Sequence, residues 1–121
     1  MTLSKEDIDE LGYRILSTLQ SNPAITQRDL AAALGISLGR TNYCLRRLVQ
    51  VGFVTMRNLR NSHRKRGYAY KLTAEGQTKK TEAAHRFLRE KEREQARLAE
   101  QIAQLRAEVR GAQAHTRNEI A

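Results

Sequence analysis

The chain has 121 residues, a formal net charge of +9 and only 5% aromatic residues. This length suits one compact domain with an appendage, and the small core must be built from aliphatic side chains. A lone cysteine, Cys44, excludes an intrachain disulfide and offers no metal-ligand spacing. The acidic, polar N-terminal stretch is unlike a secretory signal, and no run approaches the ~18 apolar residues of a membrane span. We therefore expect a cytoplasmic protein without metal or cofactor.

The positive charge is concentrated in one block. Between Leu30 and Ala74 there is no aspartate or glutamate, whereas the rest of the chain has 13 basic and 13 acidic residues and is formally neutral. A basic face of this kind attracts polyanions, among which nucleic acid is the commonest for a cytoplasmic protein. The block contains nine basic residues: Arg40, Arg46, Arg47, Arg57, Arg60, Arg64, Lys65, Arg66 and Lys71.

The first predicted helix spans residues 4–20. Ser4 suits an N-cap, and Glu6 and Asp7 would lie in the first turn, where the helix dipole favours acidic side chains. The only proline, Pro23, follows the predicted end. Apolar residues at helical spacing give this helix one buried face, made of Ile8, Leu11, Ile15, Leu16 and Leu19.

Two shorter helices follow, joined by a tight glycine turn. Thr26 and Asp29 resemble an N-terminal capping pair, and Gly35 ends the first of these helices. Ser37 caps the second, which we place at about residues 37–51. Because the second helix is basic, the pair predicts a helix-turn-helix whose second, recognition helix enters the major groove of DNA. Its inward-facing residues are predicted to be Thr41, Cys44, Leu45, Leu48 and Val49.

After the recognition helix the pattern changes to that of β-strands. Residues 53–56 are rich in strand formers, and residues 67–72 place Tyr68, Tyr70 and Leu72 on one side. A polar, basic loop lies between them. A basic strand–loop–strand directly after a recognition helix is typical of a wing, here about residues 53–72, whose tip can reach the DNA backbone or the minor groove.

The last predicted helix runs over residues 74–112 and is capped by Thr73. Its apolar residues recur in alternating steps of four and three, a heptad pattern that predicts a dimerising coiled coil and leaves parallel and antiparallel pairing open. Residues 113–121 are predicted to be a frayed tail. The seam is predicted to consist of Leu88, Gln95, Leu98, Ile102, Leu105 and Val109.

These elements together predict a mainly α fold with a small β-hairpin. We expect a winged helix-turn-helix domain over residues 1–73, followed by the long coiled-coil helix over residues 74–112. Two copies related by a two-fold axis would read a pseudo-palindromic DNA site with half-sites about one helical turn apart.

Three groups of residues are predicted to contact DNA. Arginine and asparagine can make bidentate contacts to guanine and adenine edges, while phosphate contacts position the protein on the duplex. The recognition-helix group is Ser37, Gly39, Arg40, Asn42, Tyr43, Arg46 and Arg47. The wing group is Arg57, Arg60, His63, Arg64, Lys65 and Arg66. The group at the start of the preceding helix, expected on the DNA backbone, is Thr26, Gln27 and Arg28.

Two strings carry a family resemblance: LGISLGRTNYCLRRLVQVGFV over the recognition helix and GYAYKLTAEG at the second strand. They resemble winged helix-turn-helix regulators of the MarR type, most closely the subgroup associated with bacterial exopolysaccharide (EPS) gene clusters. The resemblance covers roughly residues 8–110. It implies a bacterial transcription regulator of polysaccharide biosynthesis genes, nucleoid-associated while bound to DNA. It also implies that Arg40, Asn42 and Tyr43 face bases and that residues 60–66 form the wing tip.

Two other interpretations of the sequence remain open. The chain could be a coiled-coil adaptor, a protein-interaction module with non-specific affinity for DNA or RNA. Cys44 could be a redox sensor whose thiolate is favoured by nearby arginines, although a small, half-buried core residue is the simpler interpretation. Catalysis is not expected, because the sequence has no glycine-rich phosphate loop and no nucleophile with a matched base.

Overall fold

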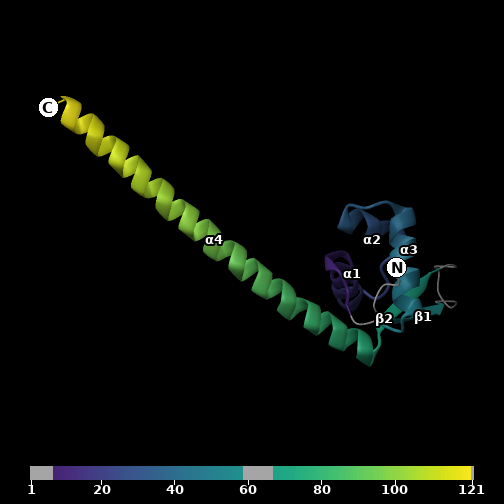
Figure 1. Ribbon diagram of the computed structural model, residues 1–121. Helices are drawn as coiled ribbons and strands as arrows, with labels where there is room; N and C mark the ends of the chain where they lie inside the picture. The colour runs from purple at the N-terminus through teal and green to yellow at the C-terminus, as the bar shows by residue number, and fades with distance from the viewer. Residues whose placement is uncertain (1–6, 59–66, 121) are drawn as a thin grey trace. The chain divides into compact units, whose positions relative to one another are not determined.

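The computed structural model describes residues 7–58 and 67–120 (Figure 1). The predicted class is confirmed, because the described chain is mostly helical with one two-stranded antiparallel hairpin. In chain order its elements are α1 (Glu10–Ser21), α2 (Gln27–Leu34), α3 (Leu38–Gln50), β1 (Val54–Asn58), β2 (Tyr68–Leu72) and α4 (Ala74–Ile120).

The start of α1 differs from the prediction. Asp9, not Ser4, is the N-cap, since its carboxylate accepts the backbone N–H of Gly12 at 2.7 Å and its own backbone is extended. Asp7 therefore precedes the helix, while the predicted cap Ser4 and the predicted first-turn residue Glu6 lie outside the described residues. Both candidates are good capping types, so residue type alone does not decide between them.

The predicted caps of the helix-turn-helix are confirmed. The Thr26 hydroxyl accepts the N–H of Asp29 at 3.0 Å, and the Ser37 hydroxyl accepts the N–H of Arg40 at 3.1 Å. Gly35 ends α2 with a left-handed backbone of φ 69°, a conformation that costs glycine little because it has no Cβ. The turn between α2 and α3 is therefore fixed by local hydrogen bonds and by one glycine.

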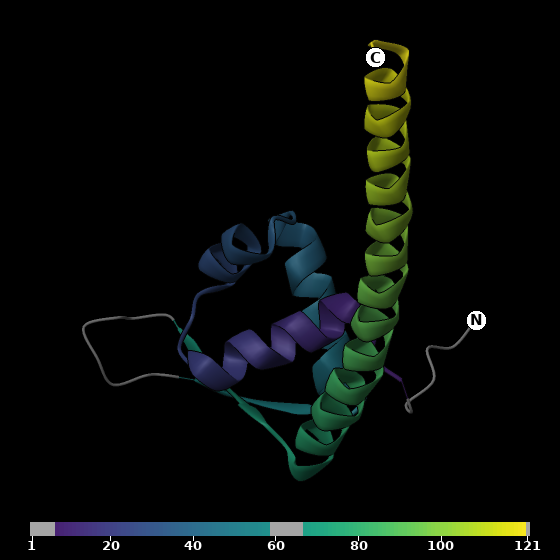
Figure 2. The same cartoon turned by 90° about the vertical axis from the view of Figure 1, so that its left-hand side faces the viewer.

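The core of this part of the chain lies where α1 contacts α2, α3 and β2 (Figure 2). Its fully buried side chains are aliphatic, apart from Phe53 and Thr41. The Thr41 hydroxyl donates to the carbonyl oxygen of Ser37 at 2.9 Å, so this buried polar group is satisfied within its own helix. The largest buried side chains are Phe53, Ile15, Leu16, Leu19, Leu30, Leu45, Val54 and Thr41.

The hairpin pairs Val54 with Leu72 at its base and Met56 with Tyr70 further along. Its first strand begins one residue later than predicted and continues to Asn58. Tyr70 and Leu72 are buried as the alternation predicts, but Tyr68 on the same side is 44% exposed. The hairpin base therefore belongs to the core, and its outer part extends beyond it.

α4 begins at a junction with the hairpin. The Thr73 hydroxyl accepts the N–H of Gly76 at 3.0 Å and donates to the carbonyl oxygen of Gly52 at 2.6 Å. The predicted end at residue 112 is wrong, because α4 continues through most of the predicted frayed tail to Ile120. Residues 113–120 contain no proline, so nothing local stops the helix.

The described chain divides into two compact units, one ending at His85 and the other beginning at Arg86. The first turns of α4 belong to the first unit, where Ala83 is fully buried. The division predicted after residue 73 was placed where the last helix begins, whereas the division after His85 reflects which residues pack together. No described helix combines the length and the apolar character that crossing a membrane requires.

Candidate nucleic-acid interface

One side of α3 packs into the core and the opposite side is exposed. Thr41, Leu45 and Leu48 are buried, as predicted. The exposed residues of the helix are Leu38, Gly39, Arg40, Tyr43, Arg46 and Gln50. A Cβ added to Gly39 would meet no atom within 4 Å, so the backbone is open to close approach at the first turn of the helix. This is the geometry that a major-groove helix needs.

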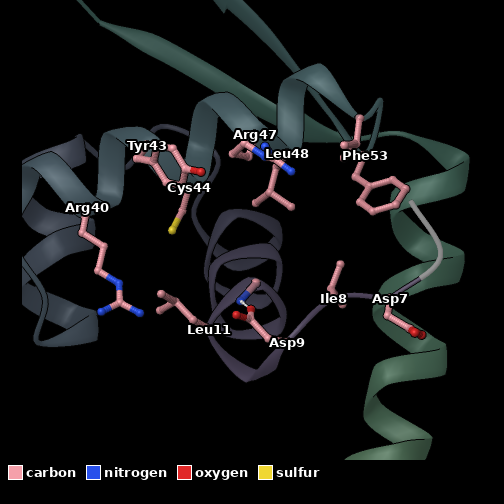
Figure 3. Close-up of a pocket in the computed structure, with 12 residues that line it drawn as sticks. Asp7, Ile8, Asp9, Leu11, Arg40, Tyr43, Cys44, Arg47, Leu48 and Phe53 are labelled. Carbon is pink, nitrogen blue, oxygen red and sulfur yellow. Dashed lines mark hydrogen bonds between the residues drawn. The ribbon is translucent and has the colours of Figure 1, made fainter. Parts of the chain in front are cut away.

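A cavity of about 350 Å³ lies along one flank of α3, between this helix and the start of α1. Figure 3 shows Arg40 and Cys44 on the α3 side and Leu11 and Asp9 on the α1 side. Arg47 also lines the cavity; it is half-buried, and its Nε atom has no hydrogen-bond partner among the described residues. Arg40 and Arg47, both predicted to contact DNA, therefore stand on the flank of α3 that faces α1.

A second hollow, of about 370 Å³, lies along the other flank of α3, toward the hairpin. We call it the wing-side hollow, lined by Gln27, Asn42, Leu45, Arg46, Val49, Gln50, Met56, Tyr68 and Tyr70. Of the predicted DNA-contacting residues it brings together Gln27, Asn42 and Arg46. The Asn42 carboxamide donates to Gln27 Oε1 at 3.1 Å, which places these two predicted contacts in one hydrogen-bonded pair.

Six residues of the wing-side hollow were not among the predicted contacts: Leu45, Val49, Gln50, Met56, Tyr68 and Tyr70. Met56 is 51% exposed although it stands opposite the buried Tyr70. The alternation of the second strand places Tyr68 and Tyr70 on one side. Extending that alternation across the hairpin to Met56 would have found the apolar wall of the hollow.

The remaining predicted contacts fall into three situations. Thr26 and Ser37 use their hydroxyls as helix caps, and Arg28 is exposed in the first turn of α2. Arg57 is exposed on β1. The wing-tip residues Arg60, His63, Arg64, Lys65 and Arg66 lie outside the described residues.

Cys44 is half-buried on the cavity flank of α3. Burial, and next the negative charge of Asp9, raise the pKa of its thiol, and these effects outweigh the positive charge and hydrogen bond of Arg40. Arg40 thus favours the thiolate, as expected, but desolvation penalises the charged form more, so the net effect is a raised pKa. At neutral pH the raised pKa leaves less of the reactive thiolate than an unperturbed cysteine would have.

Because only the thiolate reacts and the folded chain raises its pKa, iodoacetamide should alkylate Cys44 more slowly in the folded protein than in urea at the same pH. The folded rate should keep rising with pH beyond the point where the unfolded rate levels off. Mass spectrometry of timed samples measures both rates. Faster alkylation of the folded protein near neutral pH would contradict the direction of the shift.

The second unit presents an apolar strip along α4. Leu88, Leu98, Leu105 and Val109 are each more than half exposed, and Ile102 is 40% exposed. Gln95 is also exposed. The predicted seam therefore lies uncovered in the single chain. Among residues 7–58 and 67–120, no cluster of three or more histidine, cysteine or acidic side chains could hold a metal ion.

The comparisons with known proteins agree with this geometry. A model of winged helix-turn-helix DNA-binding domains matches residues 8–55. No curated protein sequence matches the chain. Among solved structures, apo wild-type MarR from E. coli is 32% identical, with a TM-score of 0.53 over 63% of this chain and 55% of that chain. A mutant MarR from E. coli, complexed with operator DNA, is 30% identical, with a TM-score of 0.54 over 63% of this chain and 53% of that one.

The match thus spans little more than half the length of either MarR chain. The adhesin competence repressor AdcR from Streptococcus pyogenes is 21% identical, with a TM-score of 0.62 over 82% of this chain and 69% of that chain, and shows the shared fold. The chain therefore contains a winged helix-turn-helix domain, and the solved structures that share its fold include MarR regulators.

Proposed function

We propose that this protein is a bacterial transcription regulator of the MarR type that binds double-stranded DNA as a homodimer. The outer surface of α3 carries the proposal. Arg46, Tyr43 and Gly39 are exposed there, on a capped and packed helix within a block of sequence that contains no acidic residue. Such a surface offers hydrogen-bond donors to base edges and positive charge to phosphates.

The apolar strip of α4 supports self-pairing. Leu98, Ile102, Leu105 and Val109 follow one another at steps of four and three residues and are exposed in the single chain. This is the repeat that two helices bury against each other in a coiled coil. A homodimer would present two recognition helices to a pseudo-palindromic site with half-sites about one helical turn apart.

We further propose that the regulated genes direct exopolysaccharide synthesis. Support comes from the resemblance of the strings around Asn42–Leu45 and Gly67–Tyr70 to regulators of that subgroup. The mutant MarR structure with operator DNA supports the choice of DNA as the partner of the winged helix. When bound to its operators, the protein would be associated with the nucleoid.

In vitro selection of bound DNA tests the proposal. The expected result is enrichment of a pseudo-palindromic sequence, and mobility-shift titration should then show tighter binding to it than to scrambled DNA at physiological salt. Equal affinity for both would refute sequence-specific binding. Stronger competition by RNA hairpins than by duplex DNA, or a monomer whose α4 captures another protein, would favour the adaptor interpretation.

Substitutions at two arginines should distinguish contacts to base edges from contacts to the DNA backbone. Arg46 faces the wing-side hollow from α3, whereas Arg57 is exposed on β1. Arg46→Ala is expected to relax preference at one base pair per half-site by about tenfold. Arg57→Ala should weaken selected and scrambled DNA alike and lower the salt slope by about 0.9 for each phosphate that Arg57 neutralises in the wild type. Mobility-shift titrations at several salt concentrations measure both effects, and a uniform loss of affinity in Arg46→Ala would contradict its role.

A further inference from the structure

A chain of hydrogen bonds connects the hairpin, α2 and α3 within the first unit. Asn42 Nδ2 donates to Gln27 Oε1 at 3.1 Å, and Gln27 Nε2 donates to the Tyr70 hydroxyl oxygen at 3.3 Å. Tyr70 is only 3% exposed, and its backbone N–H donates to the carbonyl oxygen of Pro23 at 2.9 Å. The chain therefore begins at a fixed point of the core and ends at a half-exposed side chain on the recognition helix.

The orientation of the Asn42 carboxamide decides which base edge it could read. An asparagine that offers an oxygen and an N–H side by side matches adenine, which presents an N–H donor and the N7 acceptor in the major groove. Guanine presents two acceptors there. A carboxamide that is free to rotate by 180° could also present its two N–H groups to guanine. Asn42 would then no longer distinguish adenine from guanine.

Gln27 holds the Asn42 carboxamide in one of these orientations. Gln27 Oε1 accepts one of the two N–H groups of Asn42 Nδ2. The other N–H and the Asn42 oxygen remain for a base, which is the edge that suits adenine. Gln27 Nε2 in turn donates to the Tyr70 hydroxyl oxygen, which ties the Gln27 side chain to the buried strand of the hairpin.

We propose that Gln27 is a positioning residue that sets the base preference of Asn42, with Tyr70 as its anchor. The inference rests on the proposed function, since it needs sequence-specific DNA binding. This role differs from the contact between Gln27 and the DNA backbone that the sequence predicted, because a backbone contact would affect all DNA sequences equally. Gln27 acts here through another side chain.

The test is in vitro selection with the wild-type protein and five variants. Asn42→Leu identifies the base pair that Asn42 reads. Gln27→Leu removes the orienting acceptor, while Gln27→Glu keeps it, because a carboxylate accepts from Asn42 and also from the Tyr70 hydroxyl. Gln20→Leu is the control, since Gln20 donates to Gln77 at 3.3 Å, outside the wing-side hollow. A double variant, Gln27→Leu with Asn42→Leu, completes the set.

We expect Gln27→Leu to lose about tenfold in preference for adenine at the base pair identified by Asn42→Leu, and at no other. Gln27→Glu should retain the preference while binding all DNA more weakly, because its added negative charge repels phosphates. The double variant should match Asn42→Leu alone, and Gln20→Leu should match the wild type.

An unchanged preference in Gln27→Leu would overturn the inference, and so would a uniform loss of affinity in that variant. Failure of Asn42→Leu to change any base pair would overturn it as well. A wild-type protein that enriches no sequence would instead refute the proposed function, and with it this role of Gln27. The two failures are therefore distinguishable in one experiment.

Discussion

Replacing Leu105 with aspartate is expected to convert the protein from a dimer to a monomer and to weaken operator binding by about 100-fold or more. Leu105 is 59% exposed in the single chain and lies between Ile102 and Val109 in the apolar strip of α4. Pairing would bury this side chain in both copies. This burial would stabilise the dimer by about 1.5–3 kcal/mol for each leucine. The substitution removes that gain and would place two carboxylates in the seam, where burial of unpaired charge is unfavourable.

Sedimentation equilibrium measures the change in mass, and mobility-shift titration measures the loss of affinity. The matched control is Ala107→Asp, which adds the same charge two residues away, about 200° around the helix from Leu105. Ala107 is exposed and lies off the predicted seam. A dimer should survive in the control. If Leu105→Asp also stays dimeric, the strip of α4 is not the pairing surface.

Replacing Gly76 with alanine is expected to lower the free energy of unfolding by about 3 kcal/mol. A Cβ at this position would overlap the carbonyl group of Phe53. This neighbour is backbone, and Phe53 is itself 1% exposed with its carbonyl oxygen accepting the N–H of Thr73 at 3.0 Å. Removing this overlap therefore requires the first turn of α4 to move away from the hairpin base. The higher helix propensity of alanine, worth about 1 kcal/mol, opposes this loss only in part.

Urea denaturation followed by circular dichroism measures the difference. Gly111→Ala is the matched control, because it is the same substitution in the same helix and an added Cβ meets nothing within 4 Å. This control should be as helical as the wild type or more so. If Gly76→Ala is as stable as the wild type, the junction between the hairpin base and α4 is looser than the close contact implies.

Local signals predicted the helix-turn-helix accurately. Thr26, Ser37 and Gly35 act through backbone angles and through hydrogen bonds to residues three or four positions away. Such contacts are encoded in short stretches of sequence, so residue type and spacing were sufficient to find them. The predicted start of α1 was wrong because Ser4 and Asp9 are equivalent as local signals.

The candidate site was only partly predictable. Its arginines followed from the acid-free block, but the two flanks of α3 could not be assigned before the neighbours of each flank were known. Arg40 and Arg47 face the start of α1, and Arg46 faces the hairpin. Likewise, Tyr70 and Gln27 are 43 residues apart in sequence, so no periodic pattern connects them. The pKa of Cys44 depended on burial, which residue spacing does not report.

The contact between Gly76 and Phe53 changes how the LTAEG string should be interpreted. Thr73 and Gly76 are held there by helix capping and by backbone packing at the junction, and neither lines the wing-side hollow. Selection would retain a threonine and a glycine three positions apart in any relative with this junction, whichever genes that relative controls. If Gln27, Asn42 and Arg46 set base preference as we propose, a change of target would require substitutions among them, and the threonine–glycine pair would carry no information about the target.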